Sequence, residues 1–109
     1  MVTMTAKVLA DGQLADAKGT LYTVPGATEA IIKQIKLVNT NLTTPRTVNL
    51  YIKKAASTSR RMMPANMILG AKYMWDDKQA FTLGAADLIE GDADVAAEVD
   101  FIILGVEKT

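Results

Sequence analysis

The feature that most constrains the fold is the segment Leu21-Tyr-Thr-Val-Pro-Gly26, a short apolar run that ends in a Pro-Gly turn signal. Pro presets φ for the first turn position and Gly accepts a positive φ at the next, so we expect the chain to turn there. It continues into Ala30–Asn39, a run rich in β-branched residues that Lys33 and Lys36 interrupt. Strand, turn and strand in this order are typical of a small all-β domain.

Other segments of strand length follow along the chain. Thr47–Lys53 alternates most regularly, with Val48, Leu50 and Ile52 on one face. Val99–Glu107 is apolar on both faces, which predicts a central strand covered on both sides. Shorter strands are expected at residues 2–9, 20–24, 67–69, 71–75, 81–83 and 93–97, with turns at 11–12 and 91–92 and an exposed loop at 54–61.

This pattern, about eight short strands at intervals of about 8–12 residues, predicts an all-β fold. The 109 residues suffice for one domain, which we expect to be a small β-sandwich or a jelly-roll-like barrel of antiparallel strands. Residues 1–19 are expected to add an N-terminal strand or arm to the domain formed by residues 20–109.

The composition removes most catalytic chemistry. The chain has no His and no Cys, so it lacks the usual general base, the thiolate nucleophile and the usual zinc ligands. Glu90, Asp92 and Asp94 alternate and could share one strand face as a calcium site, or simply form a solvated edge. Asp76 and Asp77 make a poor acid–base pair, because neighbours on a strand point to opposite faces. We therefore expect no enzyme activity, no catalytic residue, no cofactor and no metal.

Charge is unevenly divided along the chain. Residues 1–61 carry nine Lys or Arg and three Asp or Glu, whereas residues 62–109 carry three and nine, so the halves have net charges of +6 and −6. The alternatives are a mixed, solvated surface and a dipolar domain that packs head-to-tail against its neighbours.

Several residues are candidates for protein contacts. The basic stretch that contains Arg60 and Arg61 is either a solvated loop or a contact to an acidic protein neighbour. Nucleic acid is less favoured, because the chain is neutral overall and has few aromatics. The methionine-rich stretch is either core filler or an adaptable exposed patch. With the N-terminal arm, the candidates for partner contact are Val2, Met4, Arg60, Arg61, Met62, Met63, Met67, Met74 and Trp75. No apolar run approaches the roughly 18 residues of a membrane span, so no membrane contact is expected.

The order of the motifs resembles small β-sandwich virion structural proteins of tailed bacteriophages and prophages, of the decoration or accessory type. The resemblance rests on Thr20–Gly26, Ala30–Ile35, Val38–Thr40, Val48–Ile52, Leu88–Asp92 and Phe101–Glu107 in this order. It implies a non-enzymatic protein of the virion, assembled in the cytoplasm of a bacterial host.

Within that family, the first expectation is a capsid decoration or cement protein that stabilises the head. Its partners would be the major capsid protein or other virion proteins, and a homo-oligomer such as a trimer is compatible with this role. The alternatives are a tail, neck or fibre-base component and, from another class, a carbohydrate- or receptor-binding module. The last would need exposed rings among the six Phe, Trp and Tyr residues.

Overall fold

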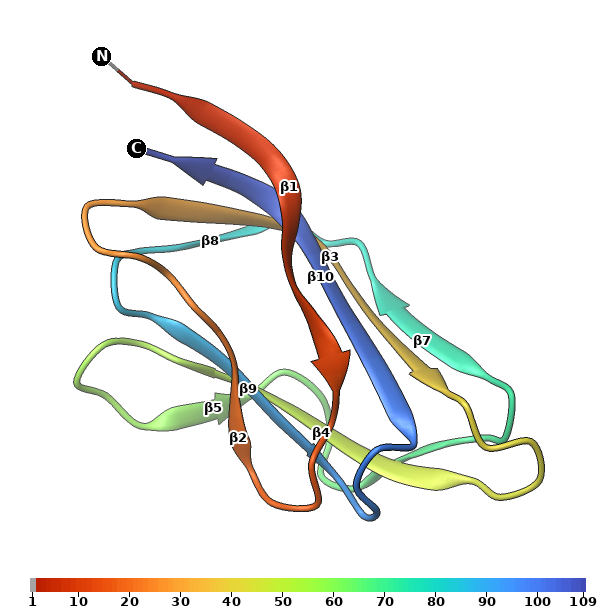
Figure 1. Cartoon of the computed structure of the whole chain (residues 1–109). Coiled ribbons are helices and arrows are strands. Elements are labelled where there is room, and N and C mark those ends of the chain that lie inside the picture. Colours follow the sequence, from red (N-terminus) through yellow and green to blue (C-terminus); the bar gives the residue numbers. More distant parts are fainter. Residues whose placement is uncertain (1) are drawn as a thin grey trace.

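The computed structural model describes residues 2–109 and consists of two five-stranded antiparallel sheets packed face to face (Figure 1). Sheet A has the order β1-β10-β3, with two further strands along the far side of β3; its members are β1 (Met4–Gln13), β10 (Val99–Lys108), β3 (Glu29–Asn39), β7 (Met74–Asp77) and β8 (Phe81–Leu83). Sheet B has the order β2-β9-β4, with two strands along β4; its members are β2 (Gly19–Thr23), β9 (Leu88–Ala93), β4 (Arg46–Lys53), β5 (Ser59–Arg61) and β6 (Met67–Leu69). The predicted all-β sandwich is confirmed, with ten strands.

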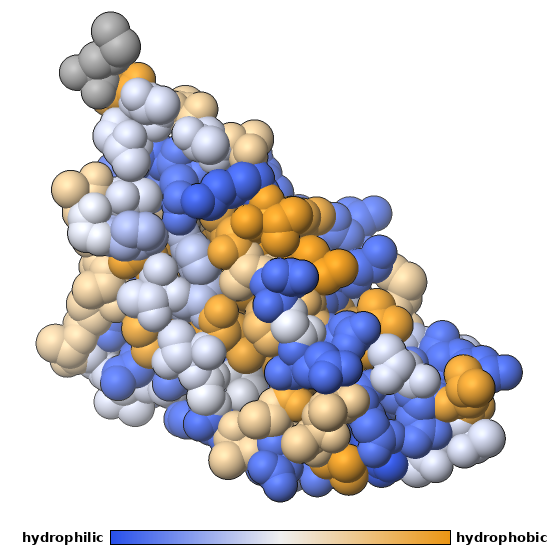
Figure 2. All heavy atoms as spheres, viewed as in Figure 1, coloured by the Kyte–Doolittle hydropathy of each residue, from blue (hydrophilic) through white to orange (hydrophobic). Residues whose placement is uncertain are grey.

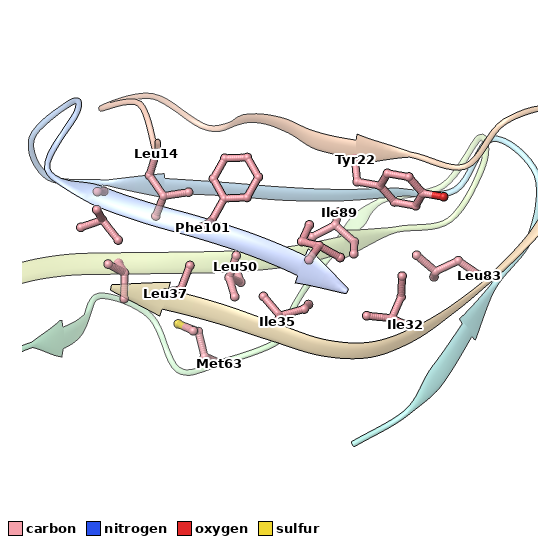
Figure 3. Close-up of a cluster of buried hydrophobic side chains, with 14 of the residues drawn as sticks. Leu14, Tyr22, Ile32, Ile35, Leu37, Leu50, Met63, Leu83, Ile89 and Phe101 are labelled. Atoms are coloured by element: carbon pink, nitrogen blue, oxygen red, sulfur yellow. The ribbon is translucent and has the colours of Figure 1, made fainter. Parts of the chain in front are cut away.

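The core fills the space between the sheets (Figure 3). Residues alternate between buried and less buried along β10, and along β3 on either side of an irregularity at Lys33, where the register with β10 shifts. Elsewhere each strand sends every second side chain inward. Fully buried aliphatic side chains come from both sheets and each contributes about 1.5–3 kcal/mol to folding; they include Ile32, Ile35, Leu37, Leu50, Ile89 and Ile103.

The last strand is central, as predicted, since β10 pairs with β1 on one side and β3 on the other. The expectation that both of its faces are covered is wrong. Val99, Phe101 and Ile103 are buried, whereas the alternating residues 102, 104 and 106 are only partly buried on the outer face of sheet A. No second layer formed by residues 2–109 covers this apolar face.

Two predicted turns are instead parts of strands. Gly12 lies in β1 opposite Phe101, and a Cβ at this position would lie 3.2 Å from the Phe101 ring. Gly91 lies in β9 opposite Leu50, and a Cβ there would lie 2.9 Å from the Leu21 side chain. Glycine within a strand often marks a place where another group packs closely. Both glycines leave space for a neighbouring side chain and do not reverse the chain.

The Pro25-Gly26 segment does turn the chain, but the turn leads from β2 in sheet B to β3 in sheet A. The residue with positive φ is Ala27, at 56°, and not Gly26 as expected. The turn therefore links the two layers of the sandwich and does not close a hairpin within one sheet.

Three other boundaries differ from the sequence-based expectation. The expected loop at 54–61 ends in a short strand, β5, which pairs with β4. The strand expected at 71–75 is shifted to β7, because residues 71–72 form a turn with Lys72 at φ 63°. The strand expected at 93–97 is wrong, since β9 ends at Ala93 and a turn follows. Residues 2–109 contain no helix that could cross a membrane.

Candidate functional site

The predicted contact residues fall into four parts of the molecule: the open edge of β1, a groove beside β5, the core, and the outer face of sheet A, where Met74 lies. At the edge, Val2, Met4 and Val8 are 60%, 59% and 53% exposed. Thr3 and Thr109 exchange two backbone hydrogen bonds of 2.9 Å, and Met4 lies opposite Lys108. Because antiparallel ladders alternate, the backbone groups of Thr3, Thr5 and Lys7 face β10, and those of the residues between them face the open edge.

The apolar outer face of sheet A adjoins this edge. Val8 lies opposite Leu104 and Ala6 opposite Val106, so the partly buried side chains of β10 continue the exposed row of β1. Figure 2 shows hydrophobic atoms gathered in the middle of the face over β1 and β10. Contiguous apolar surface of this kind is typical of a contact with another molecule.

A groove of about 540 Å³ lies beside β5. Ile52, Met62 and Phe81 give it apolar walls, and Arg60, Arg61 and Asp77 also line it. Arg61 donates a 2.7 Å hydrogen bond to Oδ1 of Asn49 and its guanidinium stacks 5.0 Å from the centre of the Tyr51 ring. Arg60 is exposed and makes no ion pair within residues 2–109. The groove thus combines apolar walls with one uncommitted cation.

The methionine-rich residues are divided between core and surface. Met63 is 5% exposed and belongs to the core, and Met62, Met67 and Trp75 are partly buried against it. Met74 is 51% exposed and lies opposite Val38 on the outer face of sheet A. The sequence left core and surface open as alternatives for Met63, and the structure places it in the core.

The charges are partly separated in space. Two backbone hydrogen bonds join the 93–98 turn to the loop after β1: the Ala93 N–H donates to the Ala15 carbonyl (2.9 Å) and the Ala97 N–H to the Leu14 carbonyl (3.2 Å). They bring acidic residues of both segments to one end of β4. Arg46 lies there and pairs with Glu98 at 3.1 Å. The Asn41 amide, followed by Arg46, holds the pKa of the Glu98 carboxyl below its usual value. Lys53 and Lys54 lie at the opposite end of β4.

The acidic residues considered as metal or acid–base candidates are each occupied by different donors. On the outer face of sheet B, Asp92 accepts hydrogen bonds from Asn49 (2.8 Å) and from the Tyr51 hydroxyl (3.2 Å), and Glu90 accepts one from Ser59. Burial, followed by the Asp92 charge, raises the pKa of the Tyr51 hydroxyl. No three acidic side chains among residues 2–109 come together as a metal site.

Asp76 and Asp77 do not form a pair. Asp76 lies opposite Lys36 on sheet A, with its Oδ2 3.4 Å from the Gln34 amide, and Asp77 lines the groove. Neighbours on a strand point to opposite faces, so the two carboxyls serve different surfaces.

The sequence missed two parts of these surfaces. Val8 belongs to the exposed row with Val2 and Met4, and the alternation of the N-terminal segment was the signal that could have included it. The outer face of β10 was missed because a strand that is apolar on both faces has the same sequence pattern whether its outer face is covered or open to a partner.

No protein-family model matches the chain, and no curated protein matches its sequence. Solved structures share its fold. A chain from the structure of Bacillus endospore appendages, a family of disulfide-linked pili, has a TM-score of 0.57 at 14% identity, covering 99% of this chain and 88% of that one. A chain from the acidic stable capsid structure of Helicobacter pylori bacteriophage KHP30 has a TM-score of 0.52 at 11% identity, covering 100% and 94%. The chain therefore has a small β-sandwich fold that also occurs in pilus and phage-capsid structures.

Proposed function

We propose that the chain is a non-enzymatic structural protein of a bacteriophage virion that decorates the capsid and stabilises the head through contacts with the major capsid protein. The observation that carries the proposal is the groove beside β5, which Arg60, without an ion pair among residues 2–109, lines together with apolar side chains. The ordered strand motifs and the fold shared with a phage-capsid chain support the same role. Protein–protein contact explains the exposed apolar face without any catalytic chemistry.

The groove suits a segment of the partner that carries an apolar side chain next to an acidic one. Ile52, Met62 and Phe81 would enclose the apolar group, and Arg60 would bind the carboxylate. Interface hot spots lie in well-packed pockets and are enriched in Arg, and truncation of such a residue costs about 2 kcal/mol or more.

The test is co-sedimentation of the protein with purified phage heads and, separately, with purified tails. We expect binding to heads, and a loss of at least about tenfold in affinity for Arg60→Glu, since about 1.4 kcal/mol corresponds to tenfold. Lys72→Glu is the matched control, because Lys72 is also exposed but lies in the turn between β6 and β7. Binding to tails and not to heads would contradict the capsid role, and equal binding of both variants would remove the groove as the contact.

The second candidate is a tail, neck or fibre component, or a filament subunit, and the fold shared with endospore appendages favours it. The sequence has no Cys, so a filament of this chain would need non-covalent contacts. Electron microscopy of the purified protein separates the two candidates, because a filament subunit forms fibres alone and a decoration protein does not. A carbohydrate-binding role is less favoured, because Tyr73, at 69%, is the single exposed ring among residues 2–109. Lys18 and Arg61 both lie over the Tyr51 ring, at 4.7 and 5.0 Å from its centre.

A further inference from the structure

The open edge of β1 is long and regular. Residues 2–8 contain no proline, and the first irregularity of β1 is the bulge between Val8 and Ala10. Figure 1 shows the first half of β1 and the end of β10 extending beyond sheet B, so no strand of sheet B lies along this half of the edge. Edges of this kind readily pair with another strand unless charges, prolines or bulges prevent it.

The edge is also self-complementary. The sequence Val2-Thr-Met-Thr-Ala-Lys-Val8 has the same pattern of apolar and polar residues when read from Thr5 in either direction. Apolar residues occupy the even positions and polar residues the odd positions. An isologous contact between two copies requires this property, because each residue meets its symmetry equivalent or a counterpart.

Charge does not oppose the contact. Lys7 is the one charged residue between Val2 and Val8, and its Nζ pairs with the Glu107 carboxylate of the same chain at 2.8 Å. The edge is therefore close to neutral, and two copies can approach without strong repulsion.

We infer that two copies of this chain pair antiparallel through β1, with a two-fold axis at Thr5, so that sheet A continues from one copy into the other. Val2 then lies opposite Val8 of the second copy, Met4 opposite Ala6, and Thr3 opposite Lys7. A register centred on Lys7 would place two cations opposite each other, and one centred on Ala6 would run into the bulge after Val8. The inference does not depend on the proposed function.

The pairing has a sharp consequence at the axis. The backbone groups of Thr5 face β10, so Thr5 of the two copies form a non-hydrogen-bonded pair with Cα atoms about 4.5 Å apart. That distance suits a disulfide. The chain has no native cysteine, so single-cysteine variants report the contact without background.

The test is oxidation of Thr5→Cys, followed by non-reducing electrophoresis and by light scattering of the wild-type protein. We expect a covalent dimer for Thr5→Cys, cross-linking of mixed Thr3→Cys and Lys7→Cys chains but of neither alone, and a wild-type mass of two chains. Ser57→Cys is the control, because Ser57 is exposed in the β4–β5 loop. Cross-linking of Thr5→Cys no faster than Ser57→Cys, or a wild-type mass of one or three chains, would overturn the inference.

Ala6→Pro gives an independent measurement. The Ala6 N–H faces the open edge, so proline removes a donor to the second copy and leaves the β1–β10 ladder intact. We expect a monomer with an unchanged circular dichroism spectrum, and a folded Ala6→Pro dimer would contradict the β1 contact. Capsid binding by the monomeric variant separates a failure of this inference from a failure of the proposed function.

Discussion

The hydroxyl of Tyr22 donates a 2.7 Å hydrogen bond to a carboxylate oxygen of Glu107, and this contact joins an edge strand of sheet B to a central strand of sheet A. Lys7 of β1 binds the other carboxylate oxygen at 2.8 Å. Burial, followed by the Glu107 carboxylate, raises the pKa of the Tyr22 hydroxyl, and the Lys7 and Tyr22 hydrogen bonds lower the pKa of Glu107. One carboxylate thus holds three strands together.

Replacement of Tyr22 by Phe should lower the free energy of unfolding by about 1 kcal/mol, because the partly buried Glu107 carboxylate loses one of its two donors. Chemical denaturation in urea measures the change. Tyr73→Phe is the control, since Tyr73 is 69% exposed and its ring makes no comparable contact. If both variants were equally stable, the Tyr22–Glu107 bond would contribute nothing.

Gly105→Ala should destabilise the fold by about 1–3 kcal/mol, the usual cost of overpacking. A Cβ at Gly105 would lie 2.2 Å from the Ile31 carbonyl oxygen on the neighbouring strand. Gly26→Ala should be tolerated, because nothing lies within 4 Å of a Cβ there and no glycine among residues 2–109 has a positive φ. Thermal unfolding of the pair compares the two directly, and a larger loss for Gly26→Ala would contradict the packing described here.

Asn39→Ala should cost about 3 kcal/mol, because it leaves buried carbonyl groups without a donor. The Asn39 side chain is 1% exposed and donates to the carbonyls of Thr44, Leu69 and Gly70 at 3.1, 3.0 and 3.2 Å. It therefore holds the β3–β4 loop against the end of β6. Thr43→Ala in the same exposed loop is the control. An equal loss of stability in both variants would show that the Asn39 side chain does not hold the loop against β6.

The acid sensitivity of the fold should depend on the buried carboxyl of Asp87. Its hydrogen bond to Lys54, at 2.8 Å, is the main cause that lowers its pKa, and the N–H groups of Ala55 and Gly84 also donate to it. Because the pKa of Asp87 is lower in the folded state than in the unfolded state, the ionised carboxyl stabilises the fold at pH values above the unfolded pKa of 3.8. This stabilisation is lost as the pH falls through the folded-state pKa.

Lys54→Met should therefore reduce stability at neutral pH and make its fall below about pH 4 shallower. Urea denaturation from about pH 7 to about pH 3 measures both effects. Lys72→Met, at an exposed position away from any carboxylate contact, should leave the profile unchanged. A profile of Lys54→Met parallel to that of the wild type would show that the ion pair does not set the acid response.

The sequence by itself determined the strands whose pattern is local. Residues 47–53 alternate with a period of two, residues 30–39 are rich in β-branched residues, and residues 20–24 precede a Pro-Gly turn signal. None of these signals requires knowledge of distant residues. The absence of His and Cys likewise removed the usual general base, the thiolate nucleophile and the usual zinc ligands from the candidates before any fold was known.

The tertiary structure decided what depends on a neighbour from elsewhere in the chain. Gly12 and Gly91 have the sequence signal of turns, but the Phe101 ring and the Leu21 side chain give them a packing role within strands. Met63 and Met74 are the same residue type, and only the opposing sheet distinguishes the buried one from the exposed one. The open edge of β1 also follows from long-range pairing, since it exists because β10 pairs between β1 and β3.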